Sequence, residues 1–286
     1  MASASVPPTD PGPGRALRSR LLTAAVLGGT LVLLVAAGSP GVLAAVLAVF
    51  LALAAWEWGA LCGWSRVAVG AWVFATLAVA TLLWGALTPG PARLVLLWAT
   101  AAGWGAAGVA VVRAERGRPA LPDGALPLVL LGWWVLVPLW LSLLWLKIAS
   151  PLLLLALFAL IWLADSAAYF VGRRYGRRRL APRISPGKTW AGVGGALLAA
   201  PVVAVVFGLP AGYRGAALAG FGMLCLVTVV ASIVGDLFES LLKRRAGVKD
   251  SGTLLPGHGG VLDRIDSLTA AAPVFCLGLS LLDSSS

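Results

Sequence analysis

The residues best suited to chemistry lie in the last third of the chain, where acidic side chains recur at helical spacing. Asp236 and Glu239 are three residues apart, and so are Asp263 and Asp266. In a helix this spacing places each pair on one face, and Lys243 continues the first face one turn beyond Glu239. Carboxylates gathered at helix ends repel one another unless a cation lies among them. Oxygen donors suit Mg²⁺ better than Zn²⁺, so the sequence predicts Asp236, Asp263 and Asp266 as magnesium ligands, with Asp236, Asp266 and Lys243 as the catalytic group.

A second group of polar residues, Ser185, Lys188 and Thr189, directly precedes an apolar run. The Gly-Lys-Thr at 187–189 resembles part of a P-loop, but that motif needs glycine where Pro182 stands. An anion site fits better, because free N–H groups and the macrodipole at a helix N-terminus favour phosphate. We therefore expect these three residues to bind substrate phosphate; a simple helix cap with an interfacial lysine is the alternative.

Two further carboxylates fall inside apolar runs. Asp165 lies about six residues, or roughly 9 Å, inside the cytoplasmic end of the run 151–171. A charge at such depth costs up to about 2.5–3.5 kcal/mol unless it faces water, a cation or a partner. Membership of a polar active site is favoured for Asp165, and pairing with a basic residue of a neighbouring helix is the alternative. Glu57, between Trp56 and Trp58, is interpreted as an interfacial carboxylate.

The composition places these groups in a membrane protein. Of the 286 residues, 60% are hydrophobic and 12% are charged, whereas soluble domains contain about 45–50% apolar and about 25% charged residues. The net charge of +11 then indicates basic loops beside a membrane, with no nucleic-acid partner. The three cysteines are widely separated, which argues against a disulfide framework.

The elements that must position the polar residues are membrane-spanning helices. Apolar runs long enough to cross a bilayer occur at 21–37, 42–59, 67–87, 94–112, 125–146, 151–171, 190–208, 216–235 and 267–282. With a cytoplasmic N-terminus, this division puts 19 of the 22 Lys and Arg residues on the inside and three on the outside. The predicted fold is therefore an all-α polytopic membrane protein with about nine spans, its N-terminus cytoplasmic and its C-terminus outside.

The chain divides into three regions of different character. Residues 1–20 are expected to form a disordered basic tail, and residues 21–150 a hydrophobic set of about five spans. The first apolar run is interpreted as a retained signal anchor rather than a cleaved signal peptide. Residues 151–286, with about four spans and polar loops, are the expected catalytic membrane domain in the cell (inner) membrane, with the polar loops facing the cytoplasm.

The C-terminal region resembles a known enzyme family. SLLKR at 240–244, KDSG at 249–252 and LPGHGGVLDRID at 255–266 match, with the same spacing, the signature of the phosphatidate cytidylyltransferases (CDP-diacylglycerol synthases). DSAAY at 165–169 and SPGKTW at 185–190 are similar to the second block of that family. One departure is Ala191, which stands where the family usually has glutamate.

This resemblance implies a polytopic enzyme, expected to be a homodimer, that forms CDP-diacylglycerol and pyrophosphate from CTP and phosphatidic acid. It implies Mg²⁺ as the cofactor, with K⁺ as a second ion, and it assigns Asp236, Asp263 and Asp266 to the metal site. Four further residues are expected around the phosphates: Lys243, Arg244, Lys249 and His258. Asp250 and Arg264 are also expected to bind substrate.

Two other functions are compatible with parts of the pattern. A CTP-dependent transferase or kinase acting on another lipid phosphate or a polyprenyl lipid would share the nucleotide and metal motif, because the motif does not report the lipid tail. A transporter of a phosphorylated lipid or anion could use the cytoplasmic basic loops, but it would not need three carboxylates at two helix ends.

Overall fold

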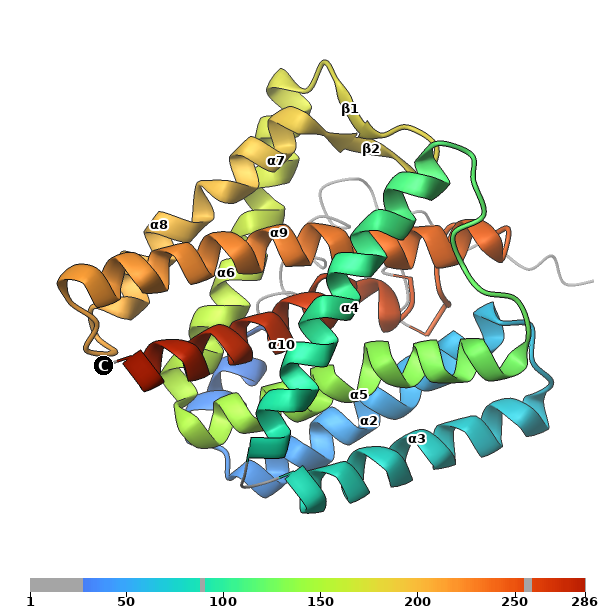
Figure 1. The fold of residues 1–286 in the computed structure, drawn as a ribbon, viewed down its shortest axis with the longest axis horizontal. Helices are drawn as coiled ribbons and strands as arrows, with labels where there is room; N and C mark the ends of the chain where they lie inside the picture. Colours follow the sequence, from blue (N-terminus) through green and yellow to red (C-terminus); the bar gives the residue numbers. More distant parts are fainter. Residues whose placement is uncertain (1–27, 88–90, 255–258, 286) are drawn as a thin grey trace, which may run out of the picture.

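The computed structural model describes residues 28–87, 91–254 and 259–285, and these are almost entirely helical (Figure 1). After a short helix, Gly28–Ala37, the long helices are α2 (Pro40–Leu61), α3 (Arg66–Leu87), α4 (Pro91–Glu115), α5 (Ala125–Ala149), α6 (Pro151–Tyr175), α9 (Gly215–Arg245) and α10 (Leu262–Ser285). Between α6 and α9 lie β1 (Arg179–Ala181), β2 (Ser185–Thr189), α7 (Trp190–Leu197), α8 (Ala199–Val203) and the π-helical turn η1 (Ala204–Gly208).

Eight helical segments of the described residues are long and apolar enough to cross a membrane. They correspond to the second to ninth predicted spans, with α7, α8 and η1 together forming one segment, Trp190–Gly208. Residues 21–27 of the first predicted span and the whole predicted tail, 1–20, lie outside the described residues, and the rest of that span is the short helix Gly28–Ala37. The helical polytopic class is confirmed, while the count of nine and the sides of the two termini stay predictions.

Local sequence determines where several helices begin. Ser39 and Ser150 each stand directly before a proline, and each hydroxyl accepts a hydrogen bond from a backbone N–H three residues later. This combination of cap and proline favours a helix start. Within the Trp190–Gly208 segment, Pro201 removes a backbone donor, and the helix continues as the π turn η1.

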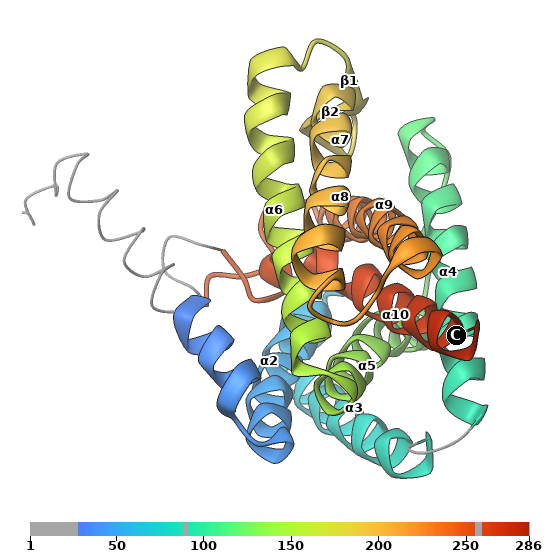
Figure 2. The same ribbon diagram turned by 90° about the vertical axis from the view of Figure 1, so that its left-hand side faces the viewer.

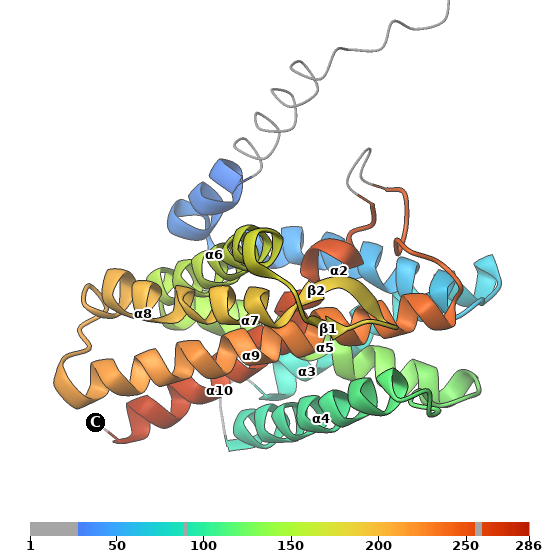
Figure 3. The ribbon, with the colours of Figure 1, turned by 90° about the horizontal axis from the view of Figure 1, so that it is seen from above.

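The C-terminal helices form the centre of the molecule. Helix α9 packs along α10, and α4 packs against both of them; α10 also packs against α5 (Figures 1 and 3). Helix α6 lies beside α7 and α8, as Figure 2 shows. A Cβ atom on Gly235 would lie 2.7 Å from the carbonyl oxygen of Asp266. Glycine at 235 therefore allows α9 and α10 to approach closely beside Asp236.

The structure departs from the predicted elements in two places. The loop 172–189 contains an antiparallel hairpin of β1 and β2, because the carboxylate of Glu115 accepts hydrogen bonds from the backbone of Arg183 (2.9 Å) and Ile184 (3.3 Å) in its turn. Helix α9 continues to Arg245, since its extension still buries apolar side chains. Asp236 therefore lies within a helix, just beyond the predicted span 216–235, on the face that its spacing from Glu239 and Lys243 predicts.

Candidate active site

All three polar groups singled out in the sequence contribute to one cavity. The cavity has a volume of about 490 Å³ and lies among α6, β2, α7, α9 and α10. Asp165 of α6, Lys188 of β2 and Asp236 of α9 all line it. Lys188 and Asp236 form an ion pair in which both side chains stay about one-quarter exposed, at 26% and 25%. Arg173 and Arg179 also line the cavity, which thus offers three basic side chains and two carboxylates to a bound molecule.

The start of α7 contributes a hydroxyl to the same cavity. Thr189 is the N-cap, and its Oγ1 accepts a hydrogen bond from the N–H of Gly192 (3.1 Å). Thr189 therefore lies at a helix N-terminus, as predicted, and its expected binding of substrate phosphate stays a prediction. Ser185 instead begins β2, four residues earlier, so the prediction that it lies at a helix N-terminus is wrong. The hairpin formed by β1 and β2 moves Ser185 away from the cap.

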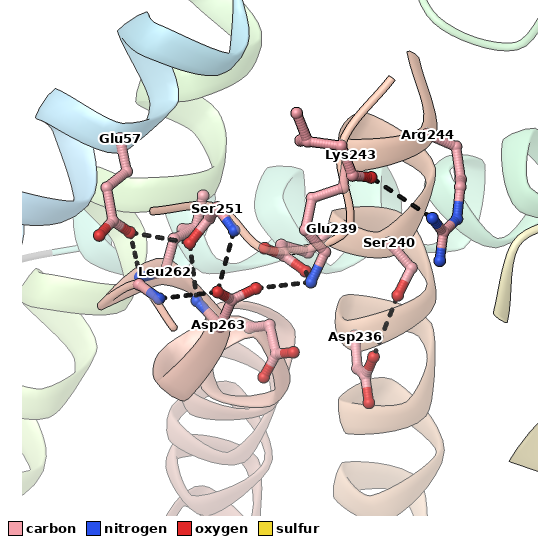
Figure 4. Close-up of polar contacts among 12 residues, drawn as sticks. Glu57, Asp236, Glu239, Ser240, Lys243, Arg244, Ser251, Leu262 and Asp263 are labelled. Atoms are coloured by element: carbon pink, nitrogen blue, oxygen red, sulfur yellow. Dashed lines mark hydrogen bonds and ion pairs between the residues drawn. The ribbon is translucent and has the colours of Figure 1, made fainter. Parts of the chain in front are cut away.

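A second cluster of charges joins α9 to the start of α10 (Figure 4). Lys243 Nζ lies 2.5 Å from Glu239 Oε2 and 2.6 Å from Asp263 Oδ1. The other oxygen of Asp263 accepts hydrogen bonds from the backbone N–H groups of Ser251 (2.9 Å) and Gly260 (2.8 Å). Asp263 therefore already has three donors within the protein.

The side chains around α9 and α10 offer the carboxylate oxygens that Mg²⁺ prefers, but the described residues do not gather the predicted ligands Asp236, Asp263 and Asp266 into one set. Asp236 and Glu239 lie close enough to Asp266 for their charges to interact with it. Glu239 Oε2 pairs with Lys243, whereas Glu239 Oε1 is buried with no hydrogen-bond partner among the described residues. Within the described ranges, no three acidic, histidine or cysteine side chains come close enough to hold an ion together. The available donors are carboxylate oxygens, the type that Mg²⁺ prefers.

Arg244, expected to bind substrate, contacts the backbone instead. Its Nε donates to the carbonyl oxygen of Ile184 (3.1 Å), and a terminal nitrogen donates to that of Val248 (3.4 Å). These bonds attach the hairpin to the end of α9. The observed contacts of Arg244 are therefore structural.

The remaining predicted residues lie around the start of α10. Lys249 and Asp250 are exposed after α9, and Asp250 lines a separate cavity of about 440 Å³. Arg264 is exposed in the first turn of α10. His258 lies outside the described residues. The structure therefore does not bring Lys249, Asp250 or Arg264 into the cavity that holds Lys188 and Asp236.

Comparison with known proteins identifies the family. Residues 18–282 match the cytidylyltransferase family. The chain belongs to this family. It is 42% identical over 271 residues to the phosphatidate cytidylyltransferase of Pseudomonas aeruginosa, covering 91% of this chain and 95% of that protein. It is 36% identical over 282 residues to that of Haemophilus influenzae, with 91% and 97% coverage. The Brucella suis protein of the same name is 38% identical over 277 residues, with 91% and 92% coverage.

Sequence reasoning also misjudged Glu57 of this cytidylyltransferase-family chain. Only 2% of it is exposed, and its carboxylate accepts hydrogen bonds from Ser251, Val261 and Leu262. The interpretation of Glu57 as an interfacial carboxylate is therefore wrong. A signal was available, because an ionisable residue inside an apolar run is costly and commonly has a specific partner.

Proposed function

We propose that this chain transfers the cytidylyl group of CTP to phosphatidic acid, forming CDP-diacylglycerol and pyrophosphate. One observation carries the proposal. Lys188 and Asp236, 48 residues apart, meet in a cavity within a chain that aligns over 91% of its length with proteins named phosphatidate cytidylyltransferase. A cavity with cationic and anionic side chains suits a phosphate substrate and its counter-ion.

The proposed reaction joins two anions. A phosphate oxygen of phosphatidic acid attacks the α-phosphorus of CTP, the bond from that phosphorus to the bridging oxygen breaks, and pyrophosphate leaves with the bond's electron pair. The attacking phosphate is already ionised near neutral pH, so no strong base is needed. Catalysis must chiefly offset charge repulsion and align the attack. In this proposal Lys188, which lines the cavity, binds phosphate oxygens, and Lys243, which pairs with Asp263, supplies positive charge.

Mg²⁺ is the proposed cofactor, with K⁺ as a second ion. Asp236 and Asp266 would hold the magnesium ion, because their charges interact and both offer carboxylate oxygens. Such an ion supplies positive charge that neutralises the phosphates. Asp263 belongs to the proposed set through its place in the signature; three donors already contact its carboxylate, and Oδ1, which contacts only Lys243 among them, keeps a lone pair for an ion.

The membrane arrangement completes the proposal. The protein is a multi-pass membrane protein, and the excess of Lys and Arg in alternate loops supports a site that faces the cytoplasm. That side holds CTP, while the exposed apolar surface of the helices gives a lipid substrate access from the bilayer. We also propose that the chain acts as a homodimer, on the basis of its resemblance to the family.

The experiment uses the purified full chain in mixed micelles. We expect pyrophosphate release only when CTP and phosphatidic acid are both present, with one CDP-diacylglycerol formed for each pyrophosphate. A polyprenyl phosphate of matched micellar concentration serves as the competing acceptor. Faster turnover of that acceptor than of phosphatidic acid would contradict the assigned lipid substrate.

A further inference from the structure

Glu57 belongs to α2, in the N-terminal half, yet its carboxylate contacts the C-terminal segments that carry the site (Figure 4). Oε2 accepts hydrogen bonds from Ser251 Oγ (2.9 Å) and from the N–H of Leu262 (2.7 Å). Oε1 accepts one from the N–H of Val261 (2.9 Å). Glu57 therefore joins Ser251, after the end of α9, to the beginning of α10.

The surroundings of Glu57 are built to accommodate a carboxylate. Burial of a carboxylate is unfavourable unless hydrogen-bond donors replace water, and three donors do so here. Two glycines leave the necessary space: a Cβ atom on Gly252 would lie 2.6 Å from Oε1, and one on Gly260 would lie 2.5 Å from Oε2. Both glycines belong to the signature segment, so its sequence is adapted to Glu57.

Ser251 transmits the effect of Glu57 to the charged cluster. Its N–H donates to Asp263 Oδ2 (2.9 Å), and its Oγ accepts a hydrogen bond from the N–H of Asp263 (3.3 Å). The other oxygen of Asp263 accepts from Lys243 (2.6 Å). Leu262, which Glu57 also holds, directly precedes Asp263 in the chain. Two short paths therefore connect Glu57 to the carboxylate that orients Lys243.

We propose that Glu57 is a positioning residue for the cytidylyl transfer. It fixes Ser251 and the first residues of α10, and thereby keeps Asp263 and Lys243 in the arrangement that the reaction requires. This role rests on the proposed function, because that function defines the reaction whose groups are positioned. In addition to apolar packing surface, the N-terminal helices thus contribute a side chain that keeps the active site ordered.

The test compares Glu57→Gln with a matched control in the same helix set. Glutamine keeps the size of the side chain, but its NH₂ group is itself a hydrogen-bond donor. It must therefore face at least one of the N–H or O–H donors whose hydrogen bonds the carboxylate accepts. Thr100→Val is the control, because Thr100 is also buried in the N-terminal half and its hydroxyl bonds only the carbonyl oxygen of Leu96 in its own helix among the contacts described. The full-length variants are assayed for kcat and for the KM of CTP, and hydrogen exchange is followed by peptide.

We expect kcat of Glu57→Gln to fall by between about tenfold and a hundredfold, as small misplacements of reacting groups do. The KM of CTP should stay within about threefold of wild type, because Glu57 contacts Ser251 and the start of α10 and binds no phosphate itself. Exchange should accelerate in the peptide that contains Val261 and Leu262, and not in α3. Thr100→Val should change neither kcat nor exchange in that peptide.

Two results would overturn the proposal. One is a kcat of Glu57→Gln within twofold of wild type, and the other is exchange that accelerates throughout α2, α3 and α5, which would indicate general loosening. Wild-type protein that forms no CDP-diacylglycerol would contradict the proposed function instead. In that case the exchange measurement still tests the positioning role, because unchanged exchange at Val261 and Leu262 in Glu57→Gln would contradict it.

Discussion

Replacement of Asp236 by asparagine tests the cavity most sharply. Asn keeps the size and polarity of the side chain but removes the charge that now pairs with Lys188 and that would hold a metal ion. The variant also leaves the α9–α10 contact unchanged, because the neighbouring Gly235 is retained. The expected result is loss of turnover in a protein that still folds.

The structure separates the catalytic effect from the effect on stability. Both partners of the Lys188–Asp236 pair keep contact with water at about one-quarter exposure. The loss of folding free energy should therefore lie between the roughly 0.2–1 kcal/mol of exposed ion pairs and the roughly 3–5 kcal/mol of buried ones. A charge that holds the reacting phosphates through a cation contributes to transition-state stabilisation, which the turnover number reports separately from folding. We expect turnover to fall at least about a hundredfold, which corresponds to about 2.7 kcal/mol of transition-state stabilisation.

The assay measures CDP-diacylglycerol formation over a Mg²⁺ titration, together with thermal unfolding of the same preparations. Asp123→Asn is the matched control, because Asp123 also pairs with a basic residue, Arg245 (3.0 Å), but is 98% exposed and lies outside the cavity. The control should keep turnover within twofold of wild type. Wild-type turnover in Asp236→Asn at every Mg²⁺ concentration would refute the assignment of this carboxylate.

Three further predictions address binding, packing and topology. Lys188→Ala should weaken binding of a phosphate substrate by about 1.5–3 kcal/mol, the scale of a charge-assisted hydrogen bond; unchanged KM values for both CTP and phosphatidic acid would leave Lys188 without a binding role. Gly235→Ala should lower the unfolding free energy by about 1–3 kcal/mol through overpacking against α10, whereas Gly105→Ala, with open space at its Cβ, should not; equal melting temperatures would contradict the close contact. Cysteines at Tyr175 and Asp250, in a background without native cysteines, should react only with reagents on the cytoplasmic side. Labelling of either from outside intact cells would contradict the predicted orientation.

The helices could largely be predicted because membrane spans require long apolar runs, a property of local sequence. The end of the apolar run at 235 did not mark the end of α9, which continues to Arg245 and buries Leu237, Phe238 and Leu242. The β1–β2 hairpin was missed because a distant partner, Glu115, stabilises its turn. Contacts between elements, rather than local propensity, decide both cases.

The candidate site shows the same division. Asp236 and Lys188 could be selected from their types and from the signature, and the structure places both in one cavity. The hydrogen bonds that occupy Asp263 depend on backbone positions that a single sequence does not reveal. Glu57 and Ser251 are separated by 194 residues, so no spacing rule connects them. Their pairing became visible only in three dimensions.

The central claim is that the chain transfers a cytidylyl group to phosphatidic acid. The most direct measurement supplies the purified protein with phosphatidic acid and with CTP labelled on either the α- or the γ-phosphorus, and then counts label in the extracted lipid. Cytidylyl transfer predicts that lipid acquires the α label, while the γ label leaves as pyrophosphate. Lipid that acquires the γ label would show a CTP-dependent kinase and contradict the claim, as would lipid that acquires neither label.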